Sequence, residues 1–291
     1  MTNLNSKTQL AKLKVLQSEM RGHKKSPTRL RFDIVGDIAI IKNAHGKRGL
    51  SWAQSILRNN KRVKVVLAQT GPVQGIFRLC KLRVIAGDNR MTTIHRETKC
   101  LFHIDLGTMH FSPRLVHERM LIAKSVGFGE DVLNMFGGAG TFSIEIADKN
   151  SSVTVFNVDI NPDAIRMCLR NVSANNLRNR VIAVLADANE AASIVFLNSM
   201  DRVLLPLPEK SCEYFSVAVS ALKRKGVIQY YDFIQTNKEE SPLQQAVVKI
   251  EGLIKGKNVS VREGRIVKSV GPRRYLVSFE LYKAEEREDV S

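Results

Sequence analysis

A glycine-rich turn at residues 137–140 is the feature that most restricts what this chain can fold into. It follows the apolar stretch VLNMF and precedes the helix-forming stretch TFSIEIA, so the glycines join a strand to a helix. About twenty residues further on, Asp159 ends a second strand-like stretch, VFNVDI. This order is typical of doubly wound α/β folds, in which a ligand approaches the glycine backbone and an acidic side chain binds its ribose hydroxyls.

The second half of the chain alternates between helix and strand patterns. Helices are predicted at 113–126, 141–149 and 162–176, and each is followed by an apolar strand pattern. Such alternation predicts a mostly parallel sheet with right-handed crossovers. The chain closes with a helix pattern at 242–254 and two strand patterns, VSVREGRIVKSV and RRYLVSFELYKA, which predict a terminal hairpin. We therefore predict an α/β, Rossmann-like domain over residues 111–291.

A second acidic residue, Asp187, ends the third strand pattern in VLADANE. Polar residues at the carboxyl ends of neighbouring parallel strands line one edge of a sheet, where ligands bind. An NAD enzyme would share these features, but the GxGxxG spacing is incomplete and no second nucleotide-binding half follows. S-adenosylmethionine, which has no pyrophosphate, fits better. The predicted cofactor-binding residues of this region are Phe136, Gly137, Gly138, Gly140, Asp159, Ile160, Asp187 and Ala188.

The sequence before residue 111 has a different character. Residues 1–30 are basic, and apolar residues recur there at near-helical spacing, which predicts a short helix within a basic tail. From Phe32 to His110 the pattern is rich in strands, with Gly36-Asp37 between two β-branched runs as a hairpin signal. We predict a small α+β domain over residues 31–110 that presents a polar face to a ligand.

The excess of positive charge predicts a polyanionic partner. The chain has 45 Lys and Arg residues against 28 Asp and Glu residues, which gives a formal net charge of +17. Basic side chains that neutralise nucleic-acid phosphates release condensed counterions, and this release favours binding. Charge alone does not distinguish RNA from DNA.

The cysteine, histidine and apolar patterns bear on disulfides, metal sites, membrane spans and cellular location. The four cysteines are scattered without CxxC spacing, and the histidines near the motifs lack metal-ligand spacing, so neither disulfides nor a metal site is predicted. No stretch approaches about 20 uninterrupted apolar residues, and the N-terminus lacks the apolar centre of a secretory signal. We expect a monomeric protein of the cytoplasm with no membrane span.

The order of several motifs resembles one family. The motifs are FDIVGDIAII, GIFRL, HRE, FSPRLVHER, NMFGGAGTFS, NVDINPDAI, DRVLLPLPEKS and RIVKSVGPRRY. In this order they are similar to the archaeal and eukaryotic tRNA (guanine-N1)-methyltransferases that act at position 37, over about residues 31–283. The resemblance implies a class I Rossmann-like methyltransferase domain preceded by a small α+β RNA-recognition domain, with S-adenosylmethionine as cofactor and tRNA as partner. The extra N-terminal domain of longer members is not expected before Phe32.

The resemblance also implies roles for individual residues. Guanine N1 carries a proton at neutral pH, so methylation there needs a base, and O6 needs a donor as it gains negative charge. The base is expected at Glu118 in SPRLVHER and the donor at Arg78 in GIFRL. Pro206 in DRVLLPLPEKS is expected to contact the cofactor. Contacts with substrate RNA are expected from Arg114, Arg119 and His110.

Two of these positions depart from the family pattern. Pro206 stands where many members have Asn, so a polar contact with guanine is missing unless a backbone carbonyl replaces it. His110 stands where a phenol is common.

Three alternative functions stay open. Relatives in the wybutosine pathway transfer the aminocarboxypropyl group of S-adenosylmethionine to a modified guanine, although Glu118 together with the LP element favours methyl transfer. Methylation of another RNA position is possible because a fold does not specify a substrate. The last alternative is a non-catalytic RNA-binding relative that has kept the fold.

Overall fold

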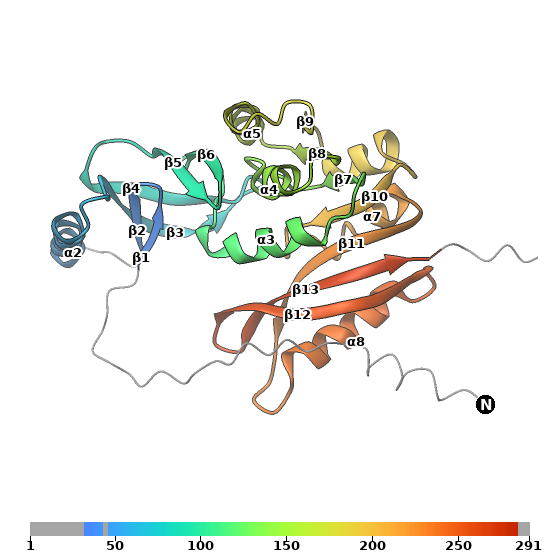
Figure 1. The fold of residues 1–291 in the computed structure, drawn as a ribbon. Coiled ribbons are helices and arrows are strands. Elements are labelled where there is room, and N and C mark those ends of the chain that lie inside the picture. The colour runs from blue at the N-terminus through green and yellow to red at the C-terminus, as the bar shows by residue number, and fades with distance from the viewer. Residues whose placement is uncertain (1–31, 43–45, 285–291) are drawn as a thin grey trace, which may run out of the picture.

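The computed structural model describes residues 32–42 and 46–284, in which a small N-terminal part is followed by a larger α/β part (Figure 1). The tail and helix predicted for residues 1–30 lie outside the described residues. Within the described ranges, none of the helices is long and apolar enough to cross a membrane.

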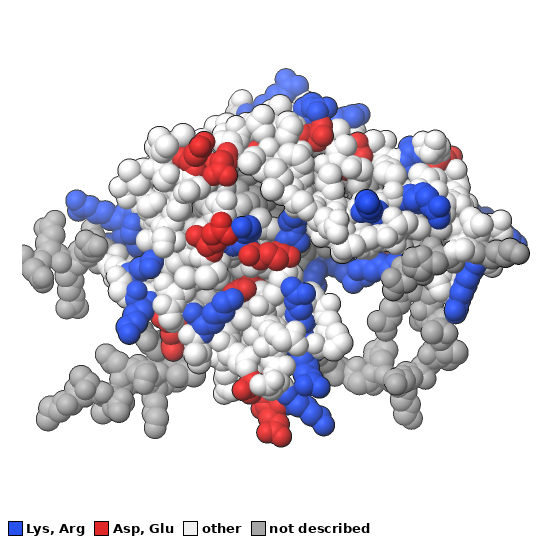
Figure 2. Space-filling model, turned by 180° about the vertical axis from the view of Figure 1, so that it is seen from behind, with Lys and Arg blue, Asp and Glu red and all other residues white. Residues whose placement is uncertain are grey.

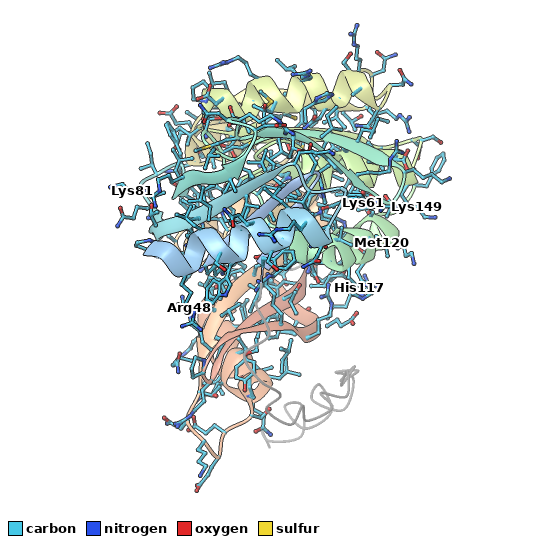
Figure 3. The ribbon with its side chains drawn as sticks, turned by 90° about the vertical axis from the view of Figure 1, so that its left-hand side faces the viewer. Arg48, Lys61, Lys81, His117, Met120 and Lys149 are labelled. Carbon is cyan, nitrogen blue, oxygen red and sulfur yellow. The ribbon has the colours of Figure 1, made fainter. Side chains whose placement is uncertain are left out.

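The N-terminal part is a four-stranded sheet with one helix packed on it. Its elements are β1 (Phe32–Val35), β2 (Ile38–Lys42), α2 (Gly46–Asn59), β3 (Val65–Gln74) and β4 (Leu79–Gly87). The hairpin predicted at Gly36-Asp37 is confirmed, because β1 and β2 pair antiparallel on either side of it. Arg48, Lys61 and Lys81 lie on the outer surface of this part (Figure 3).

The larger part contains a seven-stranded sheet. Its strands are β7 (Asp131–Asn134), β8 (Thr154–Asp159), β9 (Val181–Leu185), β10 (Met200–Leu205), β11 (Leu222–Gln235), β12 (Val259–Gly271) and β13 (Arg274–Lys283). In the order β12-β13-β11-β10-β7-β8-β9, every pair from β9 to β11 is parallel, whereas the β11–β13 and β13–β12 pairs are antiparallel. The predicted parallel sheet and terminal hairpin are both confirmed.

Helices cover both faces of this sheet. Successive side chains of a strand point to opposite faces, so strands that are apolar throughout need cover on each side. On one face lie η1 (Pro113–Leu115), α3 (Val116–Ser125), α4 (Thr141–Lys149) and α5 (Pro162–Ala174). On the other face lie α6 (Ala188–Glu190), the π-helical turn η2 (Ala191–Val195), α7 (Phe215–Ala221) and α8 (Pro242–Ile254). In β7, Val132 packs with the first group and its neighbour Leu133 with the second.

A small hairpin joins the two parts. It consists of β5 (Thr92–Glu97) and β6 (Cys100–Asp105), and Phe102 of β6 belongs to the same apolar cluster as residues of α4 and α5. Asn171 and Asn175 of α5 accept hydrogen bonds from backbone N–H groups of β6, at 2.6 and 2.8 Å. The same cluster includes Val35 and Leu67 of the N-terminal sheet, and the Gly36 N–H donates to His95 of β5, so the hairpin packs against both parts and the boundary at residue 110 stays a prediction.

Candidate cofactor and catalytic site

The glycine turn lies at the carboxyl end of β7 and leads into α4. The Gly137 N–H donates to the Val158 carbonyl at 2.8 Å, which ties the turn to β8. A Cβ on Gly137 would overlap the side chain of the buried Asn157. Gly138 has a φ of +55°, and a Cβ there would meet no atom within 4 Å. The turn therefore needs glycine for close packing on one side and offers open space for a ligand on the other.

Asp159 lies next to this turn, at the end of β8. Its Oδ2 accepts from the Gly138 N–H at 2.7 Å and its Oδ1 from the Asn161 N–H at 2.9 Å. Burial raises the pKa of Asp159, and these backbone N–H groups offset only part of that rise. The carboxylate is thus fixed against the glycine turn, where it can accept hydrogen bonds from ribose hydroxyls.

Asp187 follows β9 on the same edge of the sheet. Its Oδ1 caps the next helix by accepting from the Asn189 N–H at 2.8 Å, while Oδ2 has no hydrogen-bond partner among the residues described. Nearby, the rings of Phe136 and Tyr214 pack edge to face, with centroids 5.0 Å apart. Burial, assisted by the negative Asp187, raises the pKa of Tyr214, so its hydroxyl is protonated at neutral pH.

Apolar residues complete the crevice. Ile160 is 45% exposed beside Asp159, and Ala188 is buried under Asp187. Acidic acceptors with an apolar and aromatic wall fit a nucleoside, and the open space at Gly138 leaves room for it, so the residues present fit S-adenosylmethionine. Across the described ranges, His, Cys, Asp and Glu side chains form no cluster suited to a metal ion.

Pro206 begins the loop that follows β10. The hydroxyl of the buried Ser211 donates to the carbonyls of Leu205 and Leu207, at 2.9 and 3.0 Å, and so holds this loop in shape. Pro206 has no N–H to offer a ligand, and its contact with the cofactor remains a prediction.

Glu118 lies in the first turn of α3, and its side chain is only 2% exposed. Arg265 of β12 forms a bidentate ion pair with it, in which Nη2 donates to Oε1 at 2.7 Å and Nη1 donates to Oε2. The Tyr231 hydroxyl also donates to Oε1, at 2.7 Å. Three donors thus occupy three of the roughly four acceptor sites of this carboxylate, and Oε2, with a single donor, can still accept a proton.

Glu118 is connected to the glycine turn through aromatic side chains. Tyr231 packs against Phe142, with ring centroids 6.2 Å apart, and Phe142 is in the first turn of the helix that follows Gly140. Burial next to the Glu118 carboxylate raises the pKa of Tyr231, so the hydroxyl stays a donor. Packed side chains therefore link the buried carboxylate to the helix that follows the glycine turn.

Arg78 reaches the same region from the N-terminal part. It occupies the turn between β3 and β4 with a φ of +56°, which is unusual for a residue other than glycine. Its Nη1 donates to Glu209, in the loop after β10, so this ion pair joins the two parts of the molecule. The Arg78 Nε is buried and has no partner among the described residues. A permanently charged guanidinium with an unused N–H can donate to a substrate oxygen.

His110 lies beside this ion pair. His110 is exposed to solvent, and protein groups surround the rest of its ring. Loss of hydration, together with the positive Arg78, lowers the pKa of His110 to about 4, so the ring is neutral at physiological pH. Lys268 of β12 also interacts with His110, and burial and the positive Arg114 lower the pKa of this lysine.

The two arginines expected to contact RNA have different environments. Arg114 is 54% exposed and donates from Nε to Asp33 of β1 at 2.7 Å, so it stays an RNA candidate. Arg119 is 3% exposed, and its Nε donates to the buried Glu97 of β5 at 2.7 Å. The expectation for Arg119 is therefore corrected, because a guanidinium enclosed with its counter-ion has no surface for RNA and instead holds β5 to α3.

Sequence reasoning assigned no role to several residues of this site. Arg265 and Lys268 are part of the motif RIVKSVGPRRY, and Glu209 is part of DRVLLPLPEKS, so the motifs marked these positions without showing their contacts. Tyr231 carried no signal, because it lies within the run GVIQYYDF that reads only as a buried strand.

Comparisons with known proteins identify the family. A sequence model of the TRM5/TYW2 methyltransferase domain matches residues 93–262. The chain is also 34% identical over 253 residues to the tRNA (guanine(37)-N(1))-methyltransferase Trm5b of Pyrococcus abyssi, a match that covers 86% of this chain and 73% of that protein. The chain belongs to the TRM5/TYW2 methyltransferase family.

Other TRM5/TYW2 relatives are as similar. The chain is 34% identical over 250 residues to the tRNA 4-demethylwyosine(37)-methyltransferase Taw21 of Saccharolobus solfataricus, which covers 85% of this chain and 91% of that protein. The crystal structure of Trm5b from Pyrococcus abyssi superposes with a TM-score of 0.74 at 33% identity, over 87% of this chain and 75% of that one. The complex of aTrm5 with tRNALeu gives a TM-score of 0.75 at 29% identity, over 87% and 72%.

The bounds of the family match agree with the packing. The matched segment begins in β5, which accords with the contacts of the β5–β6 hairpin with α5. It ends in β12 just before Arg265, so the ion-pair partner of Glu118 lies outside the matched segment.

Proposed function

We propose that this protein transfers the methyl group of S-adenosylmethionine to N1 of guanosine 37 in tRNA. The observation that carries the proposal is the buried carboxylate of Glu118, which Tyr231 and Phe142 link to the helix after the glycine turn of the cofactor crevice. Relatives whose names state this reaction are 34% and 32% identical to the chain and match 86% of it. One related structure is the complex of aTrm5 with tRNALeu. We propose that the protein acts as a monomer in the cytoplasm.

The side chains of the site suit this chemistry. Bound S-adenosylmethionine supplies a methyl group on a sulfonium, which is electrophilic. Glu118 accepts the proton that leaves guanine N1, and the negative charge that develops at O6 is stabilised by Arg78. Arg265 and Tyr231 hold the Glu118 carboxylate in place before substrate binds, and Glu209 does the same for Arg78. His110, being neutral, adds no positive charge where the target base enters.

A second candidate is methylation of 4-demethylwyosine at position 37 of tRNA. The observation that favours it is the match to Taw21, which equals the match to Trm5b in identity but covers 91% of that relative instead of 73%. The aminocarboxypropyltransferase of Methanocaldococcus jannaschii is less similar, at 28% identity over 70% of this chain. Both candidates need the same cofactor crevice, so the acceptor base distinguishes them.

The test is mass spectrometry of two tRNA substrates after incubation with the protein and S-adenosylmethionine. One is an unmodified transcript with guanosine 37, and the other is the same tRNA carrying 4-demethylwyosine. A single methyl on guanosine 37, identified as the N1 isomer, supports the first proposal. A methyl only on 4-demethylwyosine selects the second candidate, and no product on either RNA would reject both.

Two variants show whether the site named here does the chemistry. Glu118→Gln should lower turnover by about 10²–10⁴-fold, because a general base contributes on that scale, while cofactor and tRNA affinities stay close to those of the parent. Asp159→Ala should instead weaken S-adenosylmethionine binding, since the ribose loses its acceptor. If the Glu118 variant binds cofactor as poorly as the Asp159 variant, Glu118 supports the crevice and is not the base.

A further inference from the structure

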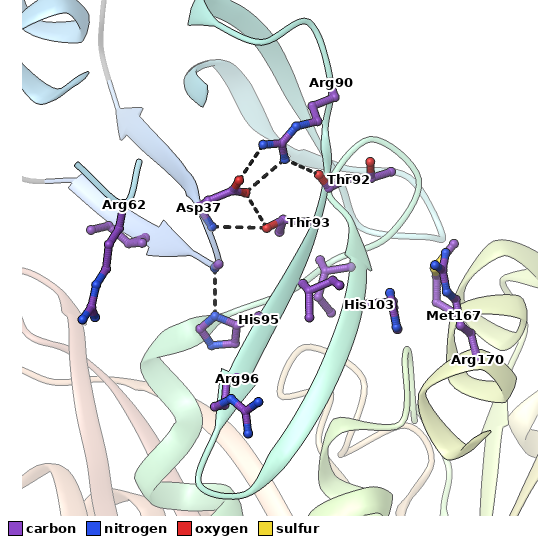
Figure 4. A pocket seen from close by; sticks show the side chains of 14 residues that line it. Asp37, Arg62, Arg90, Thr92, Thr93, His95, Arg96, His103, Met167 and Arg170 are labelled. Carbon is purple, nitrogen blue, oxygen red and sulfur yellow. Dashed lines mark hydrogen bonds and ion pairs between the residues drawn. The ribbon is translucent and has the colours of Figure 1, made fainter. Parts of the chain in front are cut away.

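A basic groove lies outside the cofactor crevice and shares no residue with it. Its volume is about 740 Å³, and it is formed by the β1–β2 turn, the segment before β3, the β5–β6 hairpin and α5. Figure 4 shows Arg96 and His103 on the hairpin, with Arg62 on one side and Arg170 of α5 on the other. We call the set Arg62, Arg90, Arg96 and Arg170 the arginine groove.

Positive charge is not confined to this place, since Lys and Arg side chains are spread over the rear face of the molecule (Figure 2). The arginine groove differs in that four arginines line a single hollow. Its one acidic side chain, Asp37, is occupied by Arg90, which donates to both carboxylate oxygens at 3.0 and 2.5 Å. Within the described part of the chain, Arg62, Arg96 and Arg170 have no ion-pair partner, and all of them are exposed.

The groove lowers the pKa of His103, one of the two histidines that line it. Loss of hydration, together with the positive Arg170, lowers the pKa of His103. A neutral ring leaves the arginines as the permanent charges of the groove, and guanidinium groups bind phosphate oxygens in a bidentate geometry. Ile94 and Met167 supply only part of the lining, and the charges come from separate elements around an open hollow. This arrangement suits an extended polyanion better than an enclosed small anion.

The groove has a fixed position relative to the catalytic site. On α5, Asn161 caps the helix beside Asp159, and Arg170 follows nine residues later on the same helix. At 1.5 Å per residue this separation is about 14 Å along the helix axis. A nucleic-acid duplex advances roughly 3 Å per base pair, so about five base pairs span it.

A chain of buried and partly buried hydrogen bonds holds the floor of the groove to α3. The Gly36 N–H donates to His95 Nδ1 at 2.9 Å, and His95 Nε2 lies 3.2 Å from Oε1 of Glu97. Glu97 in turn pairs with Arg119, the neighbour of Glu118. The groove floor and the helix that carries Glu118 are therefore held together before a ligand binds, which lowers the cost of ordering on binding.

We propose that the arginine groove binds the phosphate backbone of the paired tRNA stem next to the target nucleotide. The inference rests on the proposed function for the choice of tRNA as ligand. The stem is held by Arg62, Arg96 and Arg170 through its phosphates, so the contact carries no base specificity and sets how far the target base reaches into the site.

The test compares the double variant Arg96→Gln/Arg170→Gln with Arg224→Gln/Lys255→Gln, which removes the same charge from exposed positions outside the groove. Affinity for the full tRNA is measured at several salt concentrations. Loss of two phosphate contacts should reduce the slope of log K against log salt by about 1.5, with affinity roughly tenfold weaker. The control variant should keep the parent slope, and both variants should keep the parent affinity for S-adenosylmethionine.

Equal salt slopes for the groove variant and the control would overturn the proposal. So would a groove variant that loses affinity for guanosine monophosphate but binds tRNA like the parent, because the groove would then be a small-nucleotide site. The assay measures binding only. If the salt slopes of the parent and the groove variant differ as expected but the parent methylates no tRNA, the proposed function is rejected and the groove assignment is kept.

Discussion

The ion pair between Glu118 and Arg265 can be tested by a double-mutant cycle. In Arg265→Gln the carboxylate of Glu118, 2% exposed, loses its counter-ion. Leaving a buried charge unpaired costs about 3–5 kcal/mol of unfolding free energy. Glu118→Gln should cost less, about 1–3 kcal/mol, because Arg265 is 16% exposed and keeps partial solvation. The double variant removes both charges and should be destabilised by less than the sum.

The expected coupling energy between the two positions is therefore about 2 kcal/mol. Urea unfolding followed by circular dichroism gives the four free energies of unfolding by linear extrapolation. In thermal unfolding, Arg265→Gln should lower the Tm by roughly 6–20 °C, at about 2–4 °C per kcal/mol for a chain of this size.

A matched control comes from an exposed ion pair. Asp163 and Arg166, at positions i and i+3 of α5, have side chains that are 34% and 70% exposed. The cycle Asp163→Asn/Arg166→Gln should give a coupling below about 0.5 kcal/mol, as exposed pairs do. If the Glu118 and Arg265 effects are additive to within the same limit, the reasoning is refuted, because two buried charges in bidentate contact must be coupled.

Further predictions concern the crevice and its surroundings. Since burial raises the pKa of Asp159, S-adenosylmethionine affinity should fall as the pH drops through that raised value, which calorimetric titrations across the acid range would show; an affinity independent of pH would argue against a ribose contact. Gly138→Ala should fold, at a cost of about 1–2 kcal/mol for its left-handed backbone, but bind cofactor poorly. Gly137→Ala should be less stable than Gly138→Ala, because its methyl group overlaps Asn157. Equal melting temperatures of the two variants would contradict this. The pKa of His110 is lowered to about 4, so as the pH falls the unfolded state takes up this proton before the folded state does. This residue therefore reduces stability below the ordinary histidine range. His110→Gln should weaken that acid destabilisation in unfolding curves, and an unchanged pH dependence would mean that the ring is not desolvated.

Local patterns predicted the fold well because they are set by nearest neighbours in the chain. The strand, glycine turn and helix around Gly138 and the terminal hairpin follow from apolar periodicity, and both are observed. The place of the hairpin in the sheet did not follow, because the pairing of β13 with β11 depends on long-range packing. Likewise, Gly71 suggests the end of a strand in the sequence, but β3 continues through it. The turn into β4 therefore falls later, at residues 75–78.

Roles that depend on burial were the least predictable. Arg119 and Arg114 look alike in the sequence, yet one is enclosed with Glu97 and the other is exposed beside Asp33. The residues that flank the two arginines do not reveal this difference in burial, because Glu97 comes from a separate hairpin. The family resemblance selected Glu118 as a base but not its partner Arg265, which is 147 residues away in the chain.

This separation has a consequence for biosynthesis. At about 5–20 residues per second, a ribosome adds the 147 residues between Glu118 and Arg265 in roughly 7–30 s. During that interval the nascent chain carries a carboxylate without its cation, and β11 lacks its neighbour β13. The helices and strands up to β10 can form earlier, but the centre of the catalytic part closes only after the last strand has been made. Termination before residue 265 would therefore leave the Glu118 carboxylate without its cation, and loss of β13 would leave β11 without its neighbour.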